Sequence, residues 1–413
     1  MKVIEREEAF IRCEGDEFIN GPSVAVCPRK DIPGSGDMIL TFDRMDRRKS
    51  NLSTSIYRSS DGGRTWKFQS VFEHKFVYDL HGSSRRDGYG SVFSDDIRGT
   101  MLYFGTELYF DYGDPDSPSK KRKIYYRISF DNGFTWSDKR QIIQKGISSS
   151  GQMYDKTHYM HSVKFGANMA TLVIPNLVRT KDLTLTLGVS SQAVDPGWNR
   201  IDYYGTGFMR SGAIKAKWNA ADLGYNFEFG NWATIEVERS TRGLFEPVLS
   251  VVNGERIMMV ARGSNAPYST VEGCKFMLVS VDEGQTWSHP EPLLYDDGSI
   301  MYSSSSRART FTHSDGRLFY IGVINEKNPV GNFPRYPLCI AEIDKYSCRV
   351  KKKTVTTIVT KPDDVDDTKT LFPVDFTGHW GYEQSDGKLV VLAPCRPNLS
   401  KFGGWLNKYV IEV

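Results

Sequence analysis

Short apolar runs separated by polar, glycine-containing turns recur along the whole chain, and three of these turns share one pattern. Residues 59–66, 129–136 and 280–287 all read S-x-D-x-G-x-T-W, with five fixed positions in each copy. The β-rich runs 52–57 and 275–279 precede the first and third copies. Apolar runs on either side of a tight turn predict a series of strand–turn–strand units.

The residues of the repeated pattern suit a tight hairpin. Ser and Asp side chains bind nearby backbone N–H groups, and Gly accepts a positive φ that other residues avoid. The Trp at the end of each copy is expected to pack beneath its turn. One copy would be weak evidence, because Ser, Asp and Gly gather in any turn, but three copies with the same spacing are hard to obtain by chance.

The spacing of the copies predicts the number of units. The first two copies begin 70 residues apart and the next two 151 apart, which is one period and then two. A period near 70 fits six units in 413 residues. The skipped copy is expected near residues 201–209, and residues 343–347 are expected to form a degenerate further turn. Because no linker interrupts the pattern, we expect a single domain over residues 1–413.

The repeated turn is identified as an Asp-box, or bacterial neuraminidase repeat, and the chain resembles the sialidase superfamily of β-propellers. The resemblance implies an all-β fold, a six-bladed β-propeller of four-stranded antiparallel blades, with the boxes as structural turns on its outer rim. A strand within residues 1–20 is then expected to join the last blade beside residues 408–413. This pairing would close the ring and protect its open sheet edges.

Composition limits the possible partners and locations. The net charge of +3 is too close to balance to indicate nucleic acid, and no stretch approaches the roughly 20 apolar residues of a membrane span. The first residues contain no apolar signal segment, so we expect a cytoplasmic protein, or a secreted or periplasmic one if a leader was removed. The six cysteines show no metal-binding spacing and are expected to be free thiols. Neither a metal nor another cofactor is expected, and no feature indicates an oligomeric state.

The segment 242–262 carries the strongest local resemblance to sialidases. It is similar to their E-P-x-V-x-x-L-x-D-G-x-L-x-M-x-x-R segment, in which the Glu activates a nucleophilic Tyr and the Arg binds the substrate carboxylate. By this resemblance Glu246 is the activator and Arg262 a substrate anchor. The alternative is that both are ordinary polar residues at the edge of a blade.

Tyr302 follows the third box as the nucleophilic Tyr does in sialidases, so the resemblance makes it the candidate nucleophile. Arg307 and Arg309 follow at alternate positions of a strand and are expected to face the same side. They are candidates for substrate binding, together with Arg335, which lies in the proline-rich loop 328–338.

An aspartate near the end of the run 38–46 is the candidate general acid, and both Asp46 and Asp43 qualify. Arg44 beside them is a further candidate for substrate binding. A charged loop at the end of a strand is the alternative. His158 and His161 are candidate substrate contacts; their spacing matches metal ligands on a helix, but on a strand they would face opposite sides.

Two positions depart from the sialidase pattern. Asn20 or Gly21 stands where the first carboxylate-binding Arg is expected, and Lys275 stands near the place of the third. The sequence therefore predicts a sialidase-like glycoside hydrolase for an acidic oligosaccharide or glycoconjugate, other than ordinary sialic acid or with a rearranged anchor. A propeller polysaccharide lyase acting on uronates and a non-catalytic carbohydrate-binding propeller are the alternatives.

Overall fold

The computed structural model describes all residues except 14–16, 47–50, 75–76, 79–83, 111–117, 143–169, 172–175, 194, 196–200, 362, 364–373 and 396–403. His158 and His161 lie outside the described residues, so their expected contact with substrate stays a prediction. One short 3₁₀ helix, η3 (Lys352–Thr354), accompanies the strands of the described part. In that part no helix is long and apolar enough to cross a membrane.

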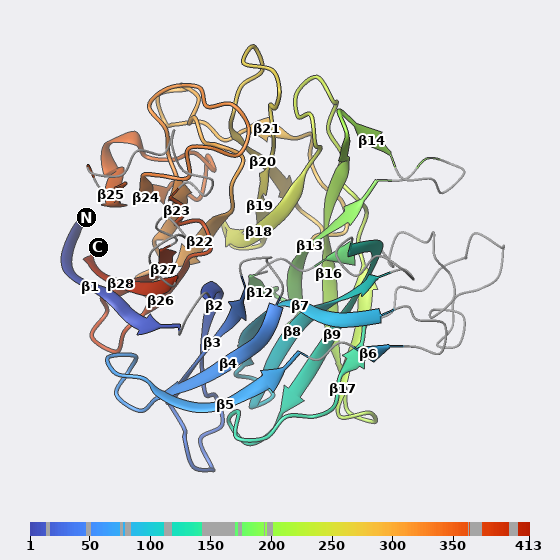
Figure 1. Cartoon of the computed structure of the whole chain (residues 1–413), viewed down its shortest axis with the longest axis vertical. Helices are drawn as coiled ribbons and strands as arrows, with labels where there is room; N and C mark the ends of the chain where they lie inside the picture. The colour runs from blue at the N-terminus through green and yellow to red at the C-terminus, as the bar shows by residue number, and fades with distance from the viewer. Residues whose placement is uncertain are drawn as a thin grey trace.

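Six antiparallel sheets surround a central axis (Figure 1), which confirms the predicted six-bladed β-propeller. The first three sheets, each given from the axis outward, follow one another along the chain. Blade 1 contains β2 (Phe18–Val26), β3 (Met38–Met45), β4 (Asn51–Ser59) and β5 (Lys67–Glu73). Blade 2 contains β7 (Ser84–Asp95), β8 (Thr100–Phe110), β9 (Pro118–Ser129) and β10 (Arg140–Gln141), with β6 (Val77–Tyr78) paired to β7. Blade 3 contains β11 (Ala170–Thr171) and β12 (Leu177–Arg179), both paired to β13 (Leu185–Gln192), then β16 (Met209–Asn219) and β17 (Gly224–Phe229).

The second half of the ring has the same order of strands. Blade 4 contains β18 (Phe245–Val252), β19 (Arg256–Arg262), β20 (Lys275–Ser280) and β21 (Glu291–Pro292). Blade 5 contains β22 (Ala308–Thr312), β23 (Leu318–Val323), β24 (Leu338–Ile343) and β25 (Thr356–Val359). Blade 6 contains β26 (Trp380–Glu383), β27 (Leu389–Cys395), β28 (Trp405–Glu412) and β1 (Lys2–Arg12). The first strand of the chain therefore pairs with the last, and the two termini lie side by side (Figure 1).

The core lies between neighbouring blades, so both faces of a blade are covered near the axis. Strand β19 shows the consequence in sequence, because residues 257–261 read Ile-Met-Met-Val-Ala and all are buried. Such a run has no polar face, unlike a sheet with one side in water. All six cysteines are free, and four of them are buried in these layers.

The three boxes join the third strand of a blade to its fourth, on the outer rim as predicted. In the first box the hydroxyl of Ser59 donates to Asp61 at 2.7 Å, and Asp61 accepts the Thr65 N–H at 2.9 Å. The second and third boxes repeat both contacts, at 2.8 and 2.8 Å and at 2.7 and 2.8 Å. Gly63 has a φ of 83°, which explains the fixed glycine.

The structure also shows where the degenerate copies lie. In blade 5 Asp344 turns the chain between β24 and β25 and accepts the Ser347 N–H at 2.7 Å, as expected for residues 343–347. The expectation for residues 201–209 was wrong. That segment contains a separate hairpin, β14 (Asp202–Tyr203) and β15 (Thr206–Gly207), whereas the rim turn of blade 3 lies between β16 and β17.

Candidate active site

Glu246 lies at the start of the inner strand β18, at one end of the propeller axis. Its φ of 49° is in the left-handed region, which a non-glycine residue rarely adopts, and the register between β18 and β19 shifts here. The Glu246 N–H donates to the Ser190 hydroxyl of blade 3 at 2.8 Å. Strained backbone held by neighbouring elements is a feature that gathers at functional sites.

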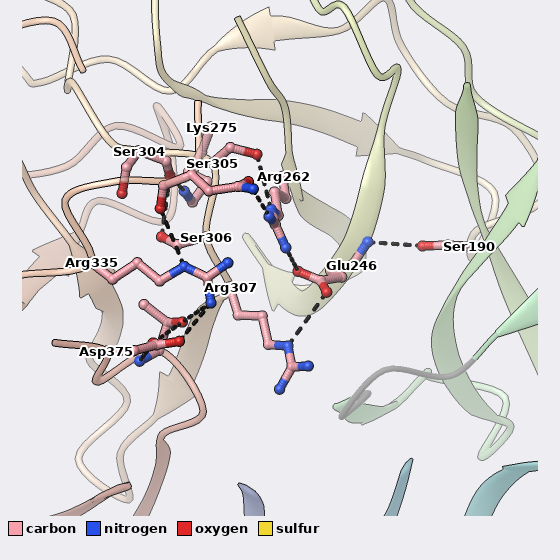
Figure 2. Close-up of polar contacts among 12 residues, drawn as sticks. Ser190, Glu246, Arg262, Lys275, Ser304, Ser305, Ser306, Arg307, Arg335 and Asp375 are labelled. Carbon is pink, nitrogen blue, oxygen red and sulfur yellow. Dashed lines mark hydrogen bonds and ion pairs between the residues drawn. The ribbon is translucent and has the colours of Figure 1, made fainter. Parts of the chain in front are cut away.

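Two arginines bind the carboxylate of Glu246 (Figure 2). Arg262 Nη1 is 2.7 Å from Glu246 Oε2, and Arg307 Nε is 3.4 Å from Oε1. Burial alone would raise the pKa of Glu246, but Arg262 and then Arg307 lower it to about 2. Glu246 is therefore a carboxylate at neutral pH and cannot serve as a proton donor there.

Arg262 is held on every side of its guanidinium group. It ends β19 and lies opposite Phe245, whose ring centroid is 4.5 Å from Arg262 Cζ. Arg262 Nε donates to the Ser305 hydroxyl at 3.1 Å, and Nη2 donates to Asn332 Oδ1 at 2.9 Å. Burial lowers the pKa of Arg262 to about 10, which leaves it charged at neutral pH. This rigid cation fixes the position of the Glu246 carboxylate.

Lys275 lies beneath Arg262, because the two residues are paired across β19 and β20. Its side chain is completely buried, and Nζ donates to the Ser303 hydroxyl at 2.8 Å and the Ser304 carbonyl at 2.7 Å. Burial, and then the nearby Arg262, lower the pKa of Lys275 to about 7. The serines that follow Tyr302 thus cap both Lys275 and Arg262 (Figure 2).

Arg335 approaches the same cluster from the proline-rich loop of blade 5. Its Nη1 is 2.6 Å from Asp375 Oδ2, and its Nε donates to the Asn332 carbonyl at 3.2 Å. Asn332 therefore links Arg335 to Arg262. The proline-rich loop thus brings Arg335 to the same cluster as Arg262.

Two further contacts complete the basic cluster, which we define as Arg242, Arg262, Lys275, Arg307 and Arg335. Arg242 Cζ lies 4.9 Å from the Phe245 ring centroid, and its charge acts on both Glu246 and Arg335. Arg307 Nη1 lies 3.5 Å from Asn20 Oδ1, so Arg307 reaches the position where the first sialidase arginine is expected. Five basic side chains thus surround Glu246 and Asp375, and an excess of positive charge remains.

The remaining catalytic candidates lie outside this cluster. Tyr302 lines a separate cavity of about 500 Å³, together with Ile300, Asn325 and Pro337. In the described part of the chain no hydrogen bond joins Tyr302 to Glu246, whose two oxygens are taken by arginines. The expected pairing of the nucleophile with its activator therefore stays a prediction.

The two candidate acids differ in access. Asp43 is completely buried and accepts a hydrogen bond of 2.8 Å from Thr54, so solvent and substrate do not reach it. Asp46 is half-buried and follows the end of β3. Arg44 binds Glu17 at 2.5 Å and takes no part in the basic cluster. Arg309 packs close to Glu246 and Arg307, and its side chain is buried.

No metal site is evident in the described residues. Within them no group of three or more His, Cys, Asp or Glu side chains is arranged to hold a metal ion. The site that they do form is a basic one, which suits an anionic ligand.

Comparison with known proteins supports the propeller fold, with low sequence identity to the solved structures. The sequence profile of the BNR repeat-like domain matches residues 47–356, well over half of the chain, whereas no curated protein sequence matches. Among solved structures, the intramolecular trans-sialidase of Ruminococcus gnavus is 13% identical, with a TM-score of 0.56 and coverage of 95% of this chain and 94% of that one. The alpha-L-arabinanase of Penicillium chrysogenum is 15% identical, with a TM-score of 0.53 and coverage of 98% and 96%.

A third neighbour is longer than this chain. The Hadza microbial sialidase Hz136 is 14% identical with a TM-score of 0.57, and the match covers 96% of this chain but 66% of that one. This chain thus spans about two thirds of that protein. At these identities the three structures share the propeller fold with the chain and establish nothing further.

Proposed function

The chain belongs to the family of BNR repeat-like domains, and from this premise we propose that it is a sialidase-like glycosidase acting on a sugar that carries a carboxylate. The observation that carries the proposal is the basic cluster around Glu246. Four arginines and a lysine from blades 4 and 5 gather at one end of the axis, with Glu246 and Asp375 as the acids among them.

An acidic sugar fits this cluster better than a neutral one. Carboxylates accept paired, charge-assisted hydrogen bonds from arginine, and each such bond is worth about 1.5–3 kcal/mol. Solved neighbours of the chain include an arabinanase complexed with arabinobiose as well as sialidases, so the fold alone does not choose between sugar classes. The excess of positive charge favours the acidic class.

Glu246 acts in this proposal as a base that becomes stronger when substrate binds. Its tight partner is Arg262 at 2.7 Å, whereas Arg307 is a looser partner at 3.4 Å and is partly exposed. A substrate carboxylate would draw Arg307 away from Glu246. Losing one of two neighbouring cations raises the pKa of a carboxylate, so Glu246 would then take a proton more readily.

Asp46 is the proposed general acid, because Asp43 is sealed in the interior. Tyr302 would have to leave its own cavity to act as the nucleophile, so we assign the activating role of Glu246 to a water molecule or a substrate hydroxyl. A Tyr302→Phe variant should then keep at least half of wild-type turnover. Loss of turnover in that variant, with the fold intact, would restore the tyrosine mechanism.

A screen of acidic oligosaccharides tests the proposal, with reducing ends and ultraviolet absorbance measured in parallel. We expect new reducing ends without absorbance from an unsaturated product, and no such signal from an Arg262→Ala variant. New ultraviolet absorbance would indicate a lyase instead. Binding of the same sugars without any product would indicate a carbohydrate-binding propeller.

A further inference from the structure

Three exposed tyrosines, Tyr203, Tyr204 and Tyr268, form a group that we call the aromatic cluster. Their exposed fractions are 38%, 53% and 43%. The ring centroids of Tyr203 and Tyr204 are 6.5 Å apart, and those of Tyr204 and Tyr268 are 5.2 Å apart with the rings at 81°. Of the four tyrosines that are exposed in the described part of the chain, three are in this cluster. Neighbouring apolar side chains that stay in contact with water mark a binding surface.

Tyr204 has a backbone conformation that tyrosine rarely adopts. Tyr203 pairs with Thr206 across the hairpin of β14 and β15, so Tyr204 and Gly205 form a two-residue turn. Both have a positive φ, 52° for Tyr204 and 74° for Gly205, as in a type I′ turn, whose first position usually holds Asn, Asp or Gly. This conformation is costly for a bulky side chain, and strain of this kind gathers at functional sites. A tyrosine at this position therefore points to a role for its ring outside the turn.

The aromatic cluster lies at the same end of the propeller as the basic cluster. The hairpin leads into β16, whose first residue, Met209, donates its N–H to the Arg242 carbonyl at 2.9 Å. Tyr268 lies in the loop that joins β19 to β20, six residues after Arg262, and Tyr204 lies five residues before Met209. Because a chain spans at most about 3.6 Å per residue, both tyrosines lie within about 25 Å of an arginine of the basic cluster. An oligosaccharide of a few units spans such a distance.

A buried asparagine fixes the Tyr268 loop against the proline-rich loop of Arg335. Asn265 is 1% exposed; its carbonyl accepts the Tyr268 N–H at 2.6 Å, and its Oδ1 accepts the Gly331 N–H at 2.8 Å. The proline-rich loop exposes a further ring, Phe333, whose centroid lies 5.4 Å from Arg335 Cζ. Exposed rings are therefore held on the same two loops that follow or carry arginines of the basic cluster.

The two clusters suit different parts of one glycan. A sugar ring has a face of C–H groups and an edge of hydroxyl groups, which matches the apolar ring and polar tip of tyrosine. Tyrosine also gives a large contact area at a small cost in entropy, because only two side-chain torsions have to be fixed. A carboxylate gains most from the arginines, whereas a neutral sugar unit gains most from the tyrosines.

We propose that the aromatic cluster binds neutral sugar units of the glycan whose acidic unit lies in the basic cluster. This inference rests on the proposed function and extends it, because it makes the substrate an oligosaccharide of several units and not a free acidic sugar. Affinity should therefore rise as neutral units are added, until the chain reaches Tyr204 and Tyr268.

Equilibrium binding tests the proposal with two series of probes, each with a lengthening neutral chain. The first series is aldouronic acids, which carry one glucuronate on a xylose chain, and the second is sialylated N-acetyllactosamine chains. Titration calorimetry is carried out in a Glu246→Gln background, in which turnover is slowed under the proposed function. We expect the longest member of at least one series to bind about 10-fold more tightly than its shortest member, since each aromatic contact contributes a factor of about 2–10.

Variants in the same background locate the gain in affinity. Tyr204→Asn removes the ring and suits the turn, so its Tm should be unchanged or higher, while the longest probe should bind about 2- to 10-fold more weakly and the shortest as before. Tyr268→Ala should weaken the longest probe in the same way, and Tyr204→Phe should retain its affinity. Tyr346→Ala is the matched control, because Tyr346 is 75% exposed in the rim turn of blade 5.

The outcomes separate this inference from the proposed function. A gain in affinity with chain length that Tyr204→Asn abolishes supports the aromatic cluster, even where the wild-type protein forms no product. Product formation without any gain from added neutral units would overturn the inference and leave the glycosidase proposal standing. An equal gain in Tyr204→Asn, or no gain in either series, would overturn it as well. Sedimentation of a dimer that Tyr204→Asn dissociates would also overturn it, by assigning the tyrosines to a contact between two copies of the chain.

Discussion

The outer rim and the end of the axis use polar residues in opposite ways. At the rim the Asp of each box takes its hydrogen bonds from residues of the same turn, as when Asp61 accepts from the Thr65 hydroxyl and backbone. At the axis the partners come from different blades, as when Ser190 of blade 3 meets Glu246 of blade 4. The rim turns repeat, whereas the end of the axis concentrates positive charge and does not repeat.

The difference shows that the residues that recur from blade to blade and the residues of the candidate active site are separate sets in this fold. Each box forms its turn from hydrogen bonds within its own few residues. The same short sequence can therefore recur in several blades. A binding site at the end of the axis combines different residues from different blades, so each of its residues appears once. Changes at the axis should therefore affect activity, and changes at the rim should affect stability alone.

The largest effect is expected for Arg262→Ala. The substitution leaves Glu246 and the Asn332 side chain without their main partner in a buried place, which costs about 3–5 kcal/mol of unfolding free energy. Turnover of the acidic substrate should disappear. Chemical denaturation and the oligosaccharide assay measure the two effects.

Arg256→Ala is the matched control for that variant, because Arg256 begins the same strand β19 and its one hydrogen bond among the described residues goes to the Tyr346 carbonyl at 3.1 Å. Its unfolding free energy should stay within about 0.5 kcal/mol of wild type. Similar losses in both variants would show that β19 is merely sensitive to substitution.

Glu246→Gln should lower turnover by about 10²–10⁴-fold, because it removes the proposed base while keeping its shape. The pKa of Glu246 is lowered to about 2 in the folded protein, so its stabilising effect is present above the ordinary value of 4.5 and is lost as the pH falls from there towards 2. The variant should lose this part of the acid sensitivity. Glu255→Gln in an exposed turn of the same blade is the control, and near-normal turnover of Glu246→Gln would refute the assignment.

The common fluorogenic sialic acid substrate should be cleaved poorly or not at all. Two of three expected carboxylate-binding arginines are replaced, at Asn20 and Lys275, and two lost charge-assisted bonds cost about 3–6 kcal/mol. That is a factor of about 10² or more in kcat/KM relative to the best acidic substrate. Arg307 contacts Asn20 and restores charge from a different direction, which suits a differently shaped acid. Efficient cleavage of the sialic acid substrate would contradict this specificity.

Lys275→Met should remove a pH dependence of stability. Because burial and Arg262 lower the pKa of Lys275 to about 7, the unfolded chain binds more protons between pH 7 and about 10, and the unfolding free energy rises over that range. The rise should be smaller in Lys275→Met than in wild type. Lys352→Met serves as the surface control, and equal slopes in wild type and Lys275→Met would count against a buried cation.

The smallest effect on activity is expected at the rim. Asp61→Ala removes the acceptor of several hydrogen bonds in the first box and should cost about 1–2 kcal/mol of unfolding free energy. Its kcat and KM should remain those of wild type. A loss of turnover at temperatures where the variant is folded would break the separation between rim and axis.

The sequence predicted the fold because the boxes are local and repeated, but it missed the rim turn of blade 3. That turn uses Asn219 and Asp222, joined by a hydrogen bond of 2.8 Å, in place of the box residues. Glu246 and Arg262 were predicted from the resemblance of their segment to sialidases. Arg307 was predicted from its place on a strand, and Arg335 from its place in the proline-rich loop. Arg242 and Asp375 were missed, because their partners depend on contacts between distant segments. Lys275 offered a signal, since a lysine within an apolar run needs a buried partner.

The most direct test of the central claim compares an acidic oligosaccharide with the same oligosaccharide after its carboxylates have been reduced to alcohols. The basic cluster should make the carboxylate essential, so the wild-type protein should release product from the acidic form and at least about 100-fold less from the reduced form. Equal turnover of the two forms, or turnover of the neutral form alone, would contradict the account.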